Sequence, residues 1–190
     1  MKYKLDSFHN LVEAFLALPT VGKKSAQRFA FHLVLKDPFS AMKLVHTLEK
    51  AVRSLQRCAE CGGISEDEIC DICLDKSRDT SLLCIVESPK DILILEENEA
   101  FVGRYYVLEN VNEEEAMKLK NRVENSAIKE IIFALTPGLS SDGVILYIEE
   151  KLKECEVNFS KIAQGIPTGV QLENVDTLSL VKALNERKEV

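Results

Sequence analysis

The sequence predicts an α/β protein built from several parts: a helical head, a small zinc finger, a mostly parallel doubly wound sheet and a C-terminal helix. Three observations predict this fold class. The first 57 residues carry apolar side chains at helical spacing, the next stretch holds two C-x-x-C pairs, and the remainder alternates short apolar strands with amphipathic helices. No apolar run reaches the roughly 18 residues of a membrane span, so we expect a cytoplasmic protein.

Charge is divided unevenly along the chain, whose net charge is −7. Residues 1–57 hold ten Lys and Arg against four Asp and Glu, a balance of +6, whereas the rest hold fourteen against 27, or −13. A basic head on an acidic body favours an anionic partner at one end and a different partner at the other. The alternative is ordinary surface charge.

The stretch "SFHNLVEAFLALPTVGKKSAQRFAFHLVL" predicts a helix over residues 8–17, a break at "LPTVG" and a second helix from about Lys24, the pattern of a helix-hairpin-helix module. Backbone N–H groups at the start of the second helix can donate to a DNA phosphate, and Gly22 allows the close approach. Lys23, Lys24 and Arg28 add charge at the same end, which predicts DNA binding without sequence recognition. The alternative is a plain helical hairpin with solvated lysines.

A third helix is predicted over "DPFSAMKLVHTLEKAVRSLQR", with Asp37 as its N-cap and Pro38 at its first position. Its apolar residues recur at helical spacing, and we expect them to form a buried stripe. The members of this stripe are Ala41, Leu44, Val45, Leu48, Ala51, Val52 and Leu55.

Four of the six cysteines lie within "CAECGGISEDEICDIC", residues 58–73. A two-residue gap lets both thiolates of a pair turn toward one ion, and two pairs close a tetrahedron around Zn²⁺. We therefore predict one structural zinc ion per chain, held by Cys58, Cys61, Cys70 and Cys73, with no open position for catalysis. A redox dithiol or an iron site is the alternative.

The acidic half contains the predicted strands "LLCIV", "RYYVLE", "EIIFAL" and "VNFSKIA", separated by helices and followed by a last helix over "DTLSLVKALNERKE" with Asp176 as its cap. This alternation indicates a largely parallel sheet. Glu87 ends the first strand, Asp91 follows it, and Asp142 follows "EIIFAL", so these carboxylates are expected near the carboxyl ends of strands, where such sheets bind ligands. Cys84 is predicted to be a buried thiol.

Four blocks in this order closely resemble the RecR family of bacterial recombination mediators: "LPTVGKKSAQRFAFHLV", the four cysteines, "CLDKSRDTSLLCIVESPKDILILE" and "IAQGIPTGVQLENVDTLSLVKALNER". The resemblance implies a helix-hairpin-helix head (1–57), a zinc finger (58–79), a Toprim-like domain (80–163) and a Walker-B-like segment with a helix (164–190). It also implies a homo-oligomeric, ring-like tetramer that clamps DNA in the nucleoid. Such a clamp would act with RecO, with RecF as a further candidate partner, to load recombinase on gapped DNA in recombinational repair.

The chain departs from the family pattern at several positions. Thr20 stands where the hairpin usually has the first of two glycines, and Ser140 and Asp142 stand where relatives usually carry two glutamates. A catalytic Toprim site needs a glutamate and paired acids that hold Mg²⁺. Because Ser140 breaks the pair, we expect no enzyme activity and an acidic edge of Glu87, Asp91 and Asp142 that binds RecO. The alternatives are a metal-dependent nuclease or primase-like enzyme using those carboxylates, or a zinc-stapled interaction protein without a DNA role.

Overall fold

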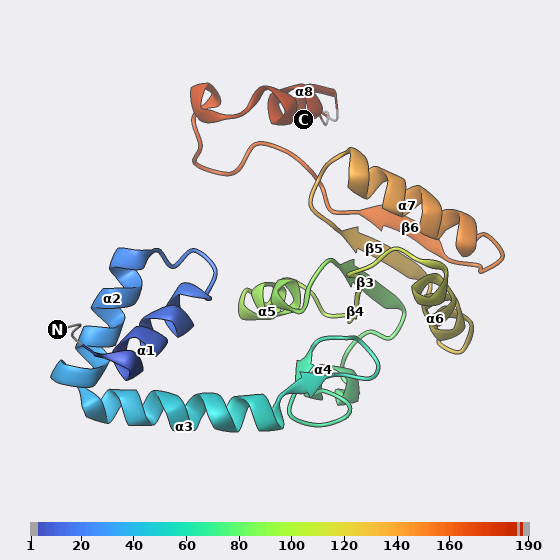
Figure 1. The fold of residues 1–190 in the computed structure, drawn as a ribbon. Helices are drawn as coiled ribbons and strands as arrows, with labels where there is room; N and C mark the ends of the chain where they lie inside the picture. The colour runs from blue at the N-terminus through green and yellow to red at the C-terminus, as the bar shows by residue number, and fades with distance from the viewer. Residues whose placement is uncertain (1–3, 186, 188–190) are drawn as a thin grey trace. The chain divides into compact units, whose positions relative to one another are not determined.

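The computed structural model describes residues 4–185 and residue 187, and the chain divides into two compact units, Met1–Leu55 and Gln56–Val190 (Figure 1). Among these described residues, no helix combines the length and the apolar character needed to cross a membrane.

The first unit begins with the predicted helical hairpin. Helix α1 (Asp6–Leu16) packs against α2 (Lys23–Phe31) around the buried side chains of Val12, Ala26 and Ala30. The chain then continues through a π-helical turn over His32–Lys36 and leaves the helical conformation at Asp37. Both hairpin helices are therefore confirmed, with bounds that differ slightly from those expected.

Helix α3 (Pro38–Ser54) begins as predicted, since the Asp37 carboxylate accepts a hydrogen bond from the Ser40 N–H at 3.0 Å. The expected buried stripe is wrong. No residue of α3 is buried, and Val52 is 81% exposed. Helical spacing shows which side of a helix is apolar, but it does not show that another part of the same chain covers that side.

The second unit contains a four-stranded, fully parallel sheet in the order β4 (Arg104–Val107), β3 (Leu82–Val86), β5 (Glu130–Ala134) and β6 (Asn158–Lys161). The chain moves from β3 outward to β4 and then returns to the other side of β3 with β5. The strand order therefore reverses between the carboxyl ends of β3 and β5, the place where open parallel sheets commonly bind ligands.

The two faces of this sheet are covered differently. Leu83 and Ile85 of β3 pack with α6 (Glu113–Glu124) and α7 (Leu139–Lys151) on one face. The alternate side chains Cys84 and Val86 pack on the other face with α5 (Pro89–Glu97) and with the zinc-finger segment. Cys84 is thus buried as predicted, and the doubly wound arrangement is confirmed.

The zinc-finger segment consists of the antiparallel pair β1 (Gln56–Arg57) and β2 (Ile64–Ser65) and the single helical turn α4 (Asp71–Leu74). At the other end of the unit, a 3₁₀ turn (Leu172–Asn174) precedes α8 (Thr177–Asn185). The predicted Asp176 cap is confirmed, because this carboxylate accepts from the Ser179 N–H at 2.9 Å. The last helix was expected to continue to residue 189, but Arg187 is not helical, and residues 186, 188 and 189 of the expected helix lie outside the described residues.

Candidate functional site

The four predicted cysteine ligands converge, and each of them is buried. Their sulfur atoms all lie within 4.8 Å of one another, with 3.6 Å between the Sγ atoms of Cys61 and Cys70 and 3.9 Å between those of Cys58 and Cys73. Zn–S bonds of about 2.3 Å in a tetrahedron place the sulfurs about 3.8 Å apart. The cluster therefore has the dimensions of a closed, structural zinc site.

Backbone N–H groups at the two C-x-x-C segments, here called the first and second knuckle, stabilise negative charge on the sulfurs. The Gly63 N–H donates to Cys61 Sγ and the Cys70 N–H donates to Cys58 Sγ, both at 3.3 Å. The pKa of Cys61 is lowered to about 5, first by its hydrogen bond with the Cys73 thiol and also by the Gly63 N–H. This favours the thiolate, the form that binds zinc, at Cys61, whereas burial raises the pKa of Cys70 to about 11, and the hydrogen bond with Cys61 together with burial raises the pKa of Cys73.

Backbone carbonyls of the finger accept hydrogen bonds from β4, and these bonds join the finger to the edge of the sheet. The Val107 N–H of β4 donates to the Cys61 carbonyl at 2.8 Å, and Arg104 Nη1 donates to the Cys73 carbonyl at 2.7 Å. Gly62, in the left-handed region with a φ of 74°, lies so close to β4 that a Cβ there would be 3.1 Å from Val107 Cβ. The role of Arg104 in holding the finger was not predicted from the sequence. The one signal for it was a charged residue at the first position of an apolar strand.

The predicted DNA-binding end is the start of α2. Gly22 is the N-cap, no side chain caps the helix, and Lys23 and Lys24 are exposed. The space where a Cβ on Gly22 would lie is open, since no atom comes within 4 Å of it. Arg28 was expected at this end, but it lies in the last turn of α2. Its guanidinium is 5.7 Å from the Phe29 ring centroid. The uncapped N–H groups and the two lysines therefore lie together at the start of α2, with Arg28 about one turn away.

The hairpin before α2 keeps a backbone conformation that suits glycine. Thr20, where the resemblance led us to expect a glycine, has a φ of 65°, in the left-handed region. A β-branched residue is uncommon there. At Thr20 the hairpin thus has a backbone conformation that glycine adopts more readily than threonine.

Two of the three predicted acidic residues lie together at the switch point of the sheet. Glu87 and Asp91 line a cavity of about 270 Å³, where Thr136 Oγ1 donates to Glu87 Oε2 at 2.6 Å. The Asp91 carboxylate accepts from the N–H and the hydroxyl of Ser88, at 2.8 and 3.0 Å, and so completes the capping box of α5. Asp91 therefore has a structural role that sequence reasoning did not assign to it.

The third acidic residue, Asp142, lies elsewhere. It is in the first turn of α7, lines a separate cavity of about 390 Å³ and has a carboxylate oxygen 3.8 Å from Lys161 Nζ. Within the described part of the chain, the cysteine cluster is the one group of three or more potential ligands whose donor atoms lie within 4.8 Å of one another. The three carboxylates thus do not converge on a common ion position.

Comparison with known proteins gives a consistent result. Residues 8–52 match the family model for the RecR helix-hairpin-helix, and residues 55–75 match the model for the RecR four-cysteine zinc finger domain. The chain is 54% identical over 190 residues to the recombination protein RecR of a Nitratiruptor species, with both chains fully covered. It is 51% identical over 186 residues to RecR of Campylobacter jejuni subsp. doylei, covering 98% of each chain.

RecR of Helicobacter pylori (strain Shi470) is 50% identical over 186 residues, covering 98% of this chain and 96% of the relative. These identities extend beyond the head and the finger to the whole length of the chain. The protein therefore belongs to the RecR family of recombination proteins, with a helix-hairpin-helix DNA-binding head, a structural zinc site and a role in recombinational DNA repair.

Proposed function

We propose that this RecR-family protein is a non-catalytic mediator that binds DNA without sequence selectivity and forms an oligomeric clamp on it. In this proposal it acts on gapped DNA with RecO, with RecF as a further candidate partner, to load recombinase. The observation that carries the proposal is the start of α2, where uncapped N–H groups, the open Gly22 and two exposed lysines lie together. A helix start of this kind favours a phosphate as its ligand.

DNA binding through α2 is tested by the salt dependence of affinity. Replacing Lys23, Lys24 and Arg28 together with Ala should flatten the plot of log affinity against log salt, by about 0.9 for each phosphate that is no longer neutralised on duplex DNA. The control replaces Lys43, Lys50 and Arg53 of α3, which changes the head's charge equally. Equal flattening in both triple variants would mean that general charge, and not the start of α2, attracts DNA.

A second test separates close approach from charge. Gly22→Ala leaves the charge unchanged, and its methyl group meets no atom within 4 Å, so the fold should be unaffected. We expect weaker DNA binding because the added carbon occupies the space that a phosphate would enter. Unchanged affinity on duplex, single-stranded and gapped DNA would contradict the assigned phosphate site.

Assembly into a ring is supported by two uncovered apolar surfaces in different parts of the chain. Phe39 and Val52 of α3 are 82% and 81% exposed. Leu178 and Leu184 of α8 are also exposed. Large exposed apolar surfaces commonly mark interfaces. Two self-complementary interfaces per chain allow four copies to close, because each copy then contacts two others.

Light scattering at several concentrations, with and without DNA, tests this assembly. Val52→Glu and Leu178→Glu should each reduce a tetramer to a dimer, since one interface remains in each case, and the double variant should be monomeric. Lys50→Gln, also on α3, lowers the charge by the same one unit and is the control. If both single variants keep the wild-type mass, these surfaces are not the interfaces.

RecO binding is proposed for the acidic residues of the sheet unit, and the two cavities can be tested separately. Glu87→Gln and Asp142→Asn are titrated with purified RecO by calorimetry, with Glu154→Gln as a control on an exposed carboxylate. Weaker binding in only one variant would identify the cavity that RecO contacts. Unchanged binding in both variants would mean that RecO binds another part of the protein. Plasmid cleavage with Mg²⁺ or Mn²⁺ that Glu87→Gln abolishes would instead favour the nuclease alternative.

A further inference from the structure

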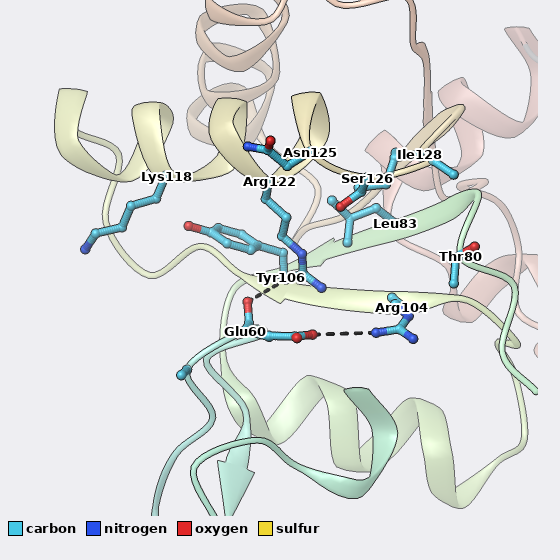
Figure 2. Close-up of a pocket in the computed structure, with 12 residues that line it drawn as sticks. Glu60, Thr80, Leu83, Arg104, Tyr106, Lys118, Arg122, Asn125, Ser126 and Ile128 are labelled. Atoms are coloured by element: carbon cyan, nitrogen blue, oxygen red, sulfur yellow. Dashed lines mark hydrogen bonds and ion pairs between the residues drawn. The ribbon is translucent and has the colours of Figure 1, made fainter. Parts of the chain in front are cut away.

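A cleft of about 630 Å³ lies beside β4, between the first knuckle of the finger and the end of α6 (Figure 2). Its apolar lining includes the exposed Ala127 and three residues of the core, Leu83, Tyr106 and Ile128, of which Leu83 is fully buried. The lining also includes three cationic side chains, from Arg104, Lys118 and Arg122, and one carboxylate, from Glu60. A unit that is acidic as a whole therefore contains a locally cationic cleft.

The two arginines of the cleft retain unused capacity to donate hydrogen bonds. Arg104 Nη1 donates to the Cys73 carbonyl and lies 3.5 Å from Glu60 Oε2, while Arg104 Nε is buried without a hydrogen-bond partner among the described residues. Arg122 Nη1 donates to the Glu60 carbonyl at 2.5 Å, and its guanidinium lies 5.6 Å from the Tyr106 ring centroid. A guanidinium has five N–H donors, so each arginine can still bind an anion.

Lys118 differs from the two arginines, because its ammonium group already lies 2.9 Å from carboxylate oxygens of both Glu114 and Glu115. Arg122 has no ion pair with a carboxylate in the described part of the chain. Figure 2 shows Arg104 beyond the end of the Glu60 carboxylate, and Arg122 reaching from α6 toward the backbone carbonyl of Glu60. Glu60 thus occupies the region that an incoming anionic group would enter.

The surroundings favour a carboxylate on a peptide over a phosphate. Asn125 and Ser126, at the C-terminal end of α6, line the cleft. The negative end of the helix dipole disfavours a doubly charged phosphate more than a singly charged carboxylate. A peptide supplies N–H donors for carbonyl groups as well as a carboxylate, which pairs well with guanidinium groups. The apolar lining suits an aliphatic neighbour of the acidic residue.

We propose that this cleft binds an acidic peptide segment of a partner protein, with a carboxylate held by Arg104 and Arg122 and an aliphatic side chain against Ala127 and the accessible edges of Tyr106 and Ile128. The site is distinct from the start of α2 and has the opposite charge preference from the acidic cavities around Glu87 and Asp142. Because Ala59 and Glu60 of the finger line it, the cleft depends on an intact zinc site.

The test uses the full-length, zinc-loaded protein and two capped synthetic peptides, Asp-Leu-Asp-Leu-Asp and its Asn-Leu-Asn-Leu-Asn counterpart, measured by calorimetry at moderate salt. Only the Asp peptide should bind. Arg122→Gln should weaken its binding about tenfold or more, the usual effect of losing a charge-assisted hydrogen bond. Lys120→Gln is the matched control, since Lys120 is on the same helix but does not line the cleft.

Glu60→Gln distinguishes a peptide site from a merely structural arginine cluster. Removing this competing carboxylate should strengthen binding of the Asp peptide about two- to fivefold, whereas a purely structural role predicts no gain. DNA affinity should be unchanged in Arg122→Gln. The proposal is overturned if neither peptide binds at millimolar concentration, if both bind equally, or if Arg122→Gln weakens oligonucleotide binding in place of peptide binding.

Discussion

Replacing Thr20 by glycine should stabilise the helical head. Thr20 has a φ of 65°, and the left-handed conformation costs an L-residue about 1–2 kcal/mol, which glycine does not incur. Thr20 is exposed, so its side chain contributes little packing that the substitution would remove. Glycine also makes the unfolded chain more flexible, which offsets roughly 0.5–1 kcal/mol. The net expectation is a gain of about 0.5–1 kcal/mol.

Native-state hydrogen exchange of the full-length protein measures this gain where it should occur. Amides of α1 and α2 that exchange by unfolding of the head should exchange about two- to fivefold more slowly, while amides of β3 should be unchanged. Thr20→Ala is the control, because it removes the β-branch but keeps the Cβ that strains the backbone. Faster exchange in Thr20→Gly, or an equal gain in Thr20→Ala, would refute the assignment of strain to this position.

Three further predictions concern other parts of the chain. Cys70→Ser should abolish stoichiometric zinc binding and reduce hydrogen-exchange protection in β3 and β4 as well as in the finger, but not in the head, because the cysteines share a core with the sheet. Gly103→Ala should lower the free energy of unfolding by about 1–3 kcal/mol in urea titrations, because its Cβ would lie 2.7 Å from a backbone oxygen of β3. Hydrogen bonding to Ser40 holds the pKa of Asp37 below its usual value. The stability this cap adds to α3 should therefore be complete above about pH 4 and decline as the pH falls through the folded-state pKa. Circular dichroism should show Asp37→Asn losing this acid sensitivity, and unchanged sensitivity would contradict the cap.

Elements specified by local patterns could be predicted from the sequence. Asp37 and Pro38 define the start of α3 because capping depends only on neighbouring residues. The zinc ligands were predictable for the same reason, since the two C-x-x-C pairs already contain the whole ligand set. The spacing of Ser88 and Asp91 also matched a capping box, and that signal should have assigned Asp91 to the start of α5.

Features that depend on distant contacts could not be predicted in this way. The order of the strands places Glu87 beside Thr136 and Asp142 beside Lys161, and no local pattern encodes that separation. The uncovered face of α3 is a similar case, because periodicity gives the apolar side of a helix without its partner. Arg104 acts on a carbonyl 31 residues earlier in the sequence, so its role became visible only in the fold.

The arrangement of the finger indicates that zinc serves the sheet unit rather than the DNA-binding head. A parallel sheet needs cover on both faces, and on the α5 side the buried cysteines share this role with Ile92 of α5. The finger also satisfies a backbone donor of the edge strand β4, because the Val107 N–H donates to the Cys61 carbonyl. Removal of zinc should therefore damage the Glu87 cavity, whose Leu95 and Ala134 pack against the core that contains the cysteines, and the cationic cleft, which Ala59 and Glu60 of the finger line. The start of α2 lies in the separate unit Met1–Leu55 and contains none of the zinc ligands. The proposed DNA contact at α2 and the proposed partner binding on the sheet unit thus have separate structural supports, so that one can fail while the other remains.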